Sequence, residues 1–386
     1  MRSLMVLVLM ALGAWGQTAS EAVRLVEGKQ TPNRQGLDGF TIEELMEKFH
    51  VPGVSVAVIR NFEVQWAKGW GFADAEAKTP VVPETMFQAA SMSKPVAALG
   101  SLKAVERGLF TLDQDVNTIL KTWKVPGNPF AAGRPVTPRG LMSHTSGTGD
   151  GFGYPGYAPG SMLPTVVEMM EGRAPSNTGA VKLVRPPFEA AQYSGGAVTI
   201  QQIALSDAAG KPFAPLMQEW VLGPIGMTNS TYQQPLPAER EKQAARAHNG
   251  AGKGSAARWH VYPEMAAAGL WTTATDLAKF LIEVQLTLQG KSGKVVNQRT
   301  MQEMVTPVGV GPFAVGFQIG KSGEGWYFEH GGANFGFRSD MVAHRVKGYG
   351  VVILTNGDAG GILTREIRER VARAYGWDTL DKPVLR

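Results

Sequence analysis

The segment from Ser91 to Gly108 constrains the fold of this chain more than any other, because it fixes where a long helix begins. Pro95 is compatible with a helix only in the first turn, where backbone N–H groups have no intrahelical acceptor. We therefore expect Ser91 to lie at the N-terminal end of this helix and Gly108 to terminate it. Apolar residues recur at helical spacing along the segment, at Val96, Leu99, Leu102 and Val105.

Lys94 follows Ser91 by three residues, so both side chains lie on one face of the helix, within reach of each other. Burial favours the neutral amine of a lysine, which can accept the proton of a serine nucleophile. The free N–H groups at a helix N-terminus also favour an anion, which gives such a serine part of an oxyanion hole. Simpler interpretations are an N-capping serine and a solvated lysine, and a lone S-x-x-K arises about once by chance in a chain of this size.

Two further motifs follow Ser91-Met92-Ser93-Lys94 along the chain, Tyr193-Ser194-Gly195 and His330-Gly331-Gly332. In this order the three motifs resemble those of the serine β-lactamase and penicillin-binding-protein superfamily, in its class C-like branch. That branch includes family VIII carboxylesterases, whose motif pattern is the most similar, together with D-aminopeptidases and D-Ala-D-Ala carboxypeptidases. The resemblance covers about residues 37–376.

The resemblance implies a role for each residue at these positions. Ser91 would be the nucleophile, Lys94 and Tyr193 would move the proton, and the backbone N–H groups of Ser91 and Ala333 would form the oxyanion hole. The alternative interpretation of Tyr193 is an aromatic residue of the core whose hydroxyl group is hydrogen-bonded.

Further residues follow from the same resemblance. Gly331 and Gly332 would let substrate lie close to the strand backbone. His144, in His144-Thr145-Ser146-Gly147, would act indirectly rather than on the substrate. Arg338 is either a ligand for a substrate carboxylate or an exposed strand residue, and we assign it no role.

The chain departs from the family pattern at two positions. Gly195 stands where β-lactamases and carboxypeptidases carry an asparagine that contacts the acyl amide of the substrate. His330 replaces a lysine that recognises a carboxylate, and a histidine is mostly neutral at pH 7. We expect His330 to donate a hydrogen bond to Tyr193 or to substrate, the alternative being a structural strand histidine. Both departures favour esters over β-lactams and peptides.

The resemblance implies an α+β fold of the β-lactamase/transpeptidase type. We expect an antiparallel sheet flanked by N- and C-terminal helices, together with an all-helical lobe. The catalytic domain would span 37–378, with an α/β lobe at about 37–90 and 265–378 and a helical lobe at about 91–264. The active site would lie where the two lobes meet.

Periodicity and turn residues predict the individual elements of both lobes. A capping box formed by Thr41 and Glu44 starts a helix over 41–50. The remaining predictions are a hairpin of 51–59 with 62–70, short helices near 138–143, 163–171, 198–208 and 214–222, strands at 313–319, 325–329, 336–346 and 349–355, and a last helix through Leu363 that ends at Gly376.

The N-terminus has the pattern of a secretory signal peptide. Arg2 precedes the apolar stretch Leu4–Leu12, and Ala14-Trp15-Gly16 offers small residues for cleavage. The stretch is too short to span a bilayer. We expect a signal peptide at 1–16, a linker at 17–36 and an exported, periplasmic or secreted protein without a stable membrane span after cleavage. A buried first helix or a retained anchor are the alternatives.

Composition excludes several kinds of chemistry. The 386 residues include no cysteine, which removes disulfides, thiolate metal sites and cysteine nucleophiles. The net charge of +5 is spread along the chain without a basic run, so we expect no nucleic-acid partner. The six histidines lack metal-ligand spacing, and we expect neither a metal nor a cofactor.

These observations predict a serine hydrolase that forms an acyl-enzyme on a small-molecule ester or amide. Our preferred interpretation is a carboxylesterase for short-chain or aryl esters. The alternatives are a D-amino-acid peptidase, a D-Ala-D-Ala carboxypeptidase or a weak β-lactamase, and an inactive binding or scaffold protein. The sequence leaves the oligomeric state open.

Overall fold

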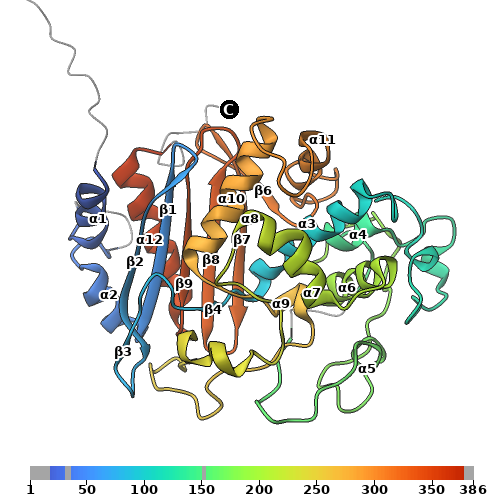
Figure 1. Cartoon of the computed structure of the whole chain (residues 1–386), viewed down its shortest axis with the longest axis horizontal. Helices are drawn as coiled ribbons and strands as arrows, with labels where there is room; N and C mark the ends of the chain where they lie inside the picture. The colour runs from blue at the N-terminus through green and yellow to red at the C-terminus, as the bar shows by residue number, and fades with distance from the viewer. Residues whose placement is uncertain (1–17, 31–35, 150–153, 378–386) are drawn as a thin grey trace, which may run out of the picture.

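A seven-stranded antiparallel sheet organises the molecule, and it is built from both ends of the chain (Figure 1). The computed structural model describes residues 18–30, 36–149 and 154–377. The sheet and its helices confirm the expected α+β class with an antiparallel sheet. The expected signal peptide at 1–16 lies outside the described residues. The sheet runs in the order β3 (Thr79–Pro80), β2 (Glu63–Asp74), β1 (Gly53–Arg60), β9 (Gly350–Thr355), β8 (Phe337–His344), β7 (Gly325–Asn334) and β6 (Gln318–Ser322).

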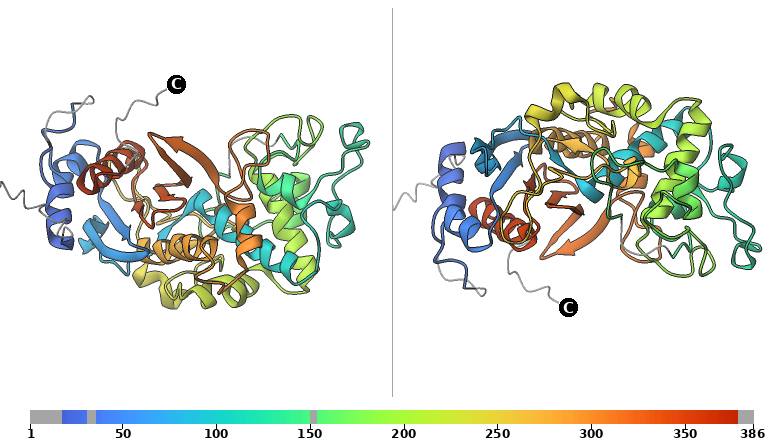
Figure 2. Two further views of the ribbon diagram at one scale, coloured as in Figure 1. Left: turned by 90° about the horizontal axis from the view of Figure 1, so that it is seen from above. Right: turned by 90° about the horizontal axis from the view of Figure 1, so that it is seen from below.

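Alternation along β1 gives the sheet two apolar faces. Val54, Val56 and Val58 pack on one side, and Ala57 and Ile59 pack on the other. The first side is covered by α1 (Ala19–Glu27), α2 (Ile42–Lys48) and α12 (Gly360–Tyr375), and the second by α10 (Ala274–Leu288) (Figure 2).

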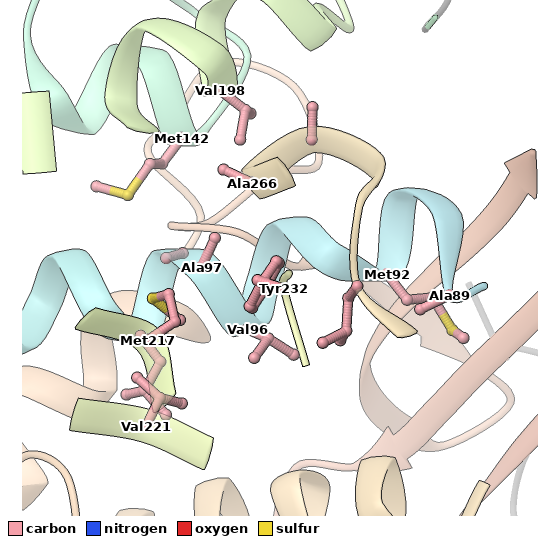
Figure 3. Packing of buried hydrophobic residues seen from close by; sticks show 14 of the residues in the cluster. Ala89, Met92, Val96, Ala97, Met142, Val198, Met217, Val221, Tyr232 and Ala266 are labelled. Atoms are coloured by element: carbon pink, nitrogen blue, oxygen red, sulfur yellow. The ribbon is translucent and has the colours of Figure 1, made fainter. Parts of the chain in front are cut away.

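The predicted central helix forms as α3 (Ser93–Glu106), preceded by a 3₁₀ turn over Ala90–Met92. Gly108 follows its end with a φ of +72°, which a glycine adopts without strain. Apolar side chains of the helical lobe surround α3, so most of its residues are buried rather than one face alone (Figure 3). Around it lie α4 (Pro138–Met142), α5 (Val166–Glu171), α6 (Gly195–Ala209), α7 (Phe213–Met217), α8 (Gly223–Ile225), α9 (Met265–Ala268) and α11 (Gln298–Met301), with the strand pair β4 (Phe87–Gln88) and β5 (Trp271–Thr272).

The expectation of a linker at 17–36 is wrong for its helical part. Thr18 and Glu21 form a capping box that starts α1, and Val26 packs against the sheet side covered by α12. Arg370 of α12, which is fully buried and pairs with Glu366 on the same helix at 2.8 Å, holds this segment by hydrogen bonds from its guanidinium to backbone carbonyl groups. Those carbonyls belong to Val26, Gly28, Leu37 and Phe40.

Two strand predictions in the C-terminal third had wrong boundaries. The apolar run at 313–319 is mostly a buried loop, because Gly316 has a φ of +95° and packs directly against Pro95 of α3. The strand begins only at Gln318. The strand predicted at 325–329 continues to Asn334 and so includes the His330-Gly331-Gly332 motif. In the described part of the chain no helix is long and apolar enough to cross a membrane.

Candidate active site

Ser91 lies at the start of the α3 helix, as Pro95 predicted. The preceding residue, Ala90, has a φ of +51°, a left-handed conformation that costs a non-glycine residue about 1–2 kcal/mol. Neighbouring groups hold this backbone in place. The Ser93 hydroxyl donates to the Ala90 carbonyl at 2.5 Å, and the Ser339 hydroxyl donates to the Ala89 carbonyl at 3.0 Å. The strained residue Ala90 therefore directly precedes the candidate nucleophile, in a segment held by these two hydrogen bonds.

Lys94 is buried, with 2% of its surface exposed, and contacts the Ser91 hydroxyl directly. Its Nζ lies 2.9 Å from Ser91 Oγ and donates to the Ala267 carbonyl at 2.7 Å. Ala267 belongs to α9, so this bond ties the lysine to a segment far along the chain. The structure thus brings together the serine and the lysine in a geometry that suits proton transfer between them.

Tyr193 lies beside this pair, with the centre of its ring 4.9 Å from Lys94 Nζ. His144 holds it there: its ring centre is 4.4 Å from that of Tyr193, and its Nδ1 accepts the backbone N–H of Ser194 at 3.1 Å. Phe313 packs edge-on against His144, with ring centres 4.7 Å apart. His144 thus contacts Tyr193, and its indirect role in the site stays a prediction. Sequence reasoning missed Phe313, because it lies in the loop that was expected to be a strand.

His330 is neutral in this site and has one N–H group to donate. Burial is the main cause that lowers its pKa from 6.5 to about 3. Its Nδ1 lies 2.6 Å from the Gly331 carbonyl, which can only accept, so the proton resides on Nδ1. The Nε2 atom is then an acceptor, buried and without a hydrogen-bond partner among the described residues. The expectation that His330 donates to Tyr193 or to substrate is therefore wrong.

The end of β7 offers a strand edge next to Ser91. The β6 strand pairs with β7 only as far as Glu329, and Gly331 and Ala333 are exposed. Asn334 fixes the end of the strand by donating to Gln88 Oε1 at 3.1 Å and to the Ala268 carbonyl at 3.0 Å. The site so assembled contains Ser91, Lys94 and Tyr193 with this edge beside them. Oxyanion binding by the N–H groups of Ser91 and Ala333 stays a prediction.

Gly332 has no room for a side chain. A Cβ atom there would lie 2.2 Å from Ser339 Oγ and 2.3 Å from the Ala89 carbonyl oxygen, which belongs to the segment leading into Ser91. We expect Gly332→Ala to destabilise the fold by about 1–3 kcal/mol through overpacking. The displaced backbone should also lower kcat/KM about a hundredfold. Thermal unfolding and ester turnover measure the two effects.

Gly331→Ala is the matched control for stability, because the nearest atom to a Cβ there is 3.6 Å away, an ordinary contact. Equal melting temperatures for the two variants would contradict the packing argument at Gly332.

The two buried histidines make the stability of the fold sensitive to acid. Burial is the main cause that lowers the pKa of His330 to about 3 and that of His144 well below 6.5. The unfolded chain binds these protons near pH 6.5, so between about pH 3 and 6.5 it holds more protons than the folded chain. Stability therefore rises with pH in this window, is fully present above it, and is lost as pH falls.

We expect His330→Gln to flatten the fall in melting temperature between pH 6.5 and 4.5. His50, which is exposed, provides the control variant His50→Gln. If the wild type and His330→Gln lose stability equally on acidification, His330 is not buried as a neutral imidazole.

No three His, Asp or Glu side chains of the described residues gather closely enough to hold a metal ion.

A sheet built from both chain ends, with a serine and a buried lysine at the start of the helix beside it, is the arrangement of the β-lactamase/transpeptidase fold. The Beta-lactamase family matches residues 41–375, and the chain belongs to this family.

Individual relatives are more distant. Protein flp of Staphylococcus aureus (strain N315) is 23% identical over 324 residues, 82% of this chain and 61% of that protein. Esterase EstB of Burkholderia gladioli is 29% identical over 222 residues, 55% of this chain and 54% of that protein. The chain thus spans 61% of the length of the first curated relatives it matches.

The fold itself has close counterparts among solved structures. The crystal structure of D-alanine carboxypeptidase AmpC from Burkholderia cenocepacia superimposes with a TM-score of 0.69 at 18% identity, covering 92% of this chain and 100% of that one.

Proposed function

We propose that this member of the β-lactamase family is a serine hydrolase that works through an acyl-enzyme. The 2.9 Å contact between Lys94 Nζ and Ser91 Oγ supports it, because an amine at this distance can take the hydroxyl proton as the oxygen attacks. The Ser91 oxygen bonds to the carbonyl carbon, the serine proton passes by way of Lys94 and Tyr193 to the leaving oxygen, and the bond between that oxygen and the carbonyl carbon breaks. Water then attacks the acyl-enzyme, gives its proton back along the same route, and releases the acid.

Its substrates in this proposal are carboxylic esters with short or aryl acyl groups and no carboxylate beside the scissile bond. One observation carries this choice: His330, which stands at the position of the family's lysine, is a buried neutral imidazole and supplies no ammonium group. A substrate carboxylate would therefore be desolvated without a cationic partner, which costs about 1–3 kcal/mol or more. The name of the relative Esterase EstB is in keeping with an ester substrate.

Arg338 does not replace the missing ammonium group. Its guanidinium pairs with Asp358 at 3.0 Å and donates to the carbonyls of Asn334 and Phe337, each at 2.7 Å. A substrate carboxylate would have to compete with this ion pair. The arrangement therefore disfavours β-lactams and D-Ala-D-Ala peptides, which carry a carboxylate.

A turnover panel tests the proposal. The purified protein is assayed with p-nitrophenyl butyrate, nitrocefin and a D-Ala-D-Ala peptide, with background corrected by Ser91→Ala. We expect kcat/KM for the ester to exceed the other two at least about a hundredfold. Equal rates on nitrocefin and butyrate would overturn the ester assignment. Inactivity on all three would favour the alternative of a binding or scaffold protein.

We also propose export, which rests on the sequence pattern of residues 1–16 alone. The test is N-terminal sequencing of the mature protein from a fractionated bacterial host. A protein that retains Met1 in the cytoplasmic fraction would contradict it.

A further inference from the structure

The space beside Gly195 is occupied by the ring of Tyr154. A Cβ atom built on Gly195 would lie 2.8 Å from Cε2 of that ring, closer than real Cβ contacts allow. Gly195 begins α6, two residues after Tyr193. A side chain at position 195 would therefore project into volume that Tyr154 fills. The absence of the family's asparagine goes together with an aromatic ring in its place.

Hydrogen bonds hold this ring against the start of α6. The Thr199 hydroxyl lies 3.1 Å from the Gly195 carbonyl and donates to it, so the Tyr154 hydroxyl is the donor in its own 3.1 Å contact with Thr199. The ring packs against the main hydrophobic core while staying partly exposed. Tyr154 is thus held by Thr199 and by the core, with part of its surface exposed.

The next residues connect Tyr154 to the opposite side of the site. The Pro155 carbonyl accepts from His260 Nδ1 at 2.8 Å. The His260 ring stacks on Phe335, with ring centres 3.9 Å apart. Phe335 directly follows the exposed edge of β7. Tyr154 therefore lies on a segment that contacts the start of α6 and, through Pro155 and His260, the end of β7.

We infer that Tyr154 forms the wall of the acyl subsite and selects flat, apolar acyl groups, such as those of aromatic and arylacetic acid esters. The inference rests on the proposed ester hydrolase function. An aromatic ring pairs favourably with another ring in offset or edge-on contact. The face of the ring offers no hydrogen-bond partner for the amide of an acylamino substrate, and the hydroxyl proton is used in the bond to Thr199.

The first experiment compares acyl groups on one leaving group. The ratio of kcat/KM for p-nitrophenyl phenylacetate to that for p-nitrophenyl acetate is measured in the wild type, Tyr154→Phe and Tyr154→Leu. We expect the ratio to stay within about twofold in Tyr154→Phe, which keeps the ring, and to fall roughly tenfold in Tyr154→Leu, which loses it. An unchanged ratio in Tyr154→Leu overturns the inference.

The second experiment tests whether Tyr154 occupies the space of a side chain at position 195. It measures the ratio of kcat/KM for the p-nitrophenyl ester of N-acetylglycine to that for p-nitrophenyl butyrate. Gly195→Asn alone should gain nothing, because the ring blocks the new side chain. Tyr154→Ala with Gly195→Asn should raise the ratio roughly tenfold over Tyr154→Ala alone. The same gain in Gly195→Asn alone would show that Tyr154 does not occupy this space.

The two hypotheses fail in different ways. A wild-type protein without ester turnover contradicts the proposed function. Ester turnover with a phenylacetate preference that is insensitive to Tyr154→Leu contradicts only the role of Tyr154. If Tyr154→Leu does not fold, Gly195→Asn is still compared with the wild type. A higher N-acetylglycine-to-butyrate ratio in Gly195→Asn contradicts the inference. An unchanged ratio, with butyrate turnover retained, supports it.

Discussion

Ser91→Ala should abolish turnover, with kcat falling by at least about 10⁴-fold, while the protein stays folded. The loss is large because the bond to the acyl group forms at Ser91 Oγ, and no other group near Lys94 replaces that oxygen in the mechanism. The fold should survive because Ser91 is only partly buried and its hydroxyl contacts Lys94. Ester turnover and covalent labelling by a fluorophosphonate measure the effect, and circular dichroism checks the fold.

Ser93→Ala is the matched control, two residues away on the same turn. The Ser93 hydroxyl donates to the Ala90 carbonyl and accepts the N–H of Leu270 at 3.0 Å, so it has a structural part. We expect this variant to lose stability and keep fluorophosphonate labelling. Labelling that persists in Ser91→Ala would place the nucleophile elsewhere.

Lys94→Arg should reduce kcat/KM by about 10²–10⁴-fold, the usual contribution of a general base. A guanidinium stays protonated at any working pH, so it can keep the positive charge but cannot take the serine proton. It would also have to replace an Nζ that is bonded at the same time to Ser91 Oγ and the Ala267 carbonyl. The measurement is kcat/KM from pH 5 to 10, because a loss of proton acceptance should persist across the range.

Lys103→Arg provides the control for a lysine on the same helix. The Lys103 ammonium donates to the Val295 carbonyl at 2.5 Å and pairs with Glu106 at 3.5 Å, away from Ser91. It should retain normal rates. Near-normal rates in Lys94→Arg as well would mean that Lys94 supplies only charge.

The parts of the site that could be predicted from sequence are those fixed by local rules. Pro95 placed Ser91 at the helix start, and the spacing of three residues placed Lys94 beside it. The order of the three motifs then brought in Tyr193. Helix α1 could also have been found, because Thr18 and Glu21 have the spacing of a capping box.

Features that depend on contacts between distant segments could not be predicted. The hydrogen bond from His330 to its own neighbour's carbonyl decides that Nε2 accepts, and no sequence pattern records that choice. The ion pair between Arg338 and Asp358 likewise joins β8 to the loop after β9. From the sequence, Gly195 indicated only that the family's asparagine is absent. In the structure the ring of Tyr154, a residue distant in sequence, fills the space that a side chain at position 195 would take.

The pairing of β1 with β9 has a consequence for how the protein is made. Val54 pairs with Thr355, so the centre of the sheet closes only after about 300 residues more have been synthesised, some 15–60 s at ordinary ribosome speeds. During that time the β1–β2 hairpin has an open edge whose residues are buried on both faces in the finished sheet. A chain that stops before Gly350 lacks the strand that covers this edge. Yield in the cell therefore depends on how well the nascent hairpin is kept from pairing with other chains.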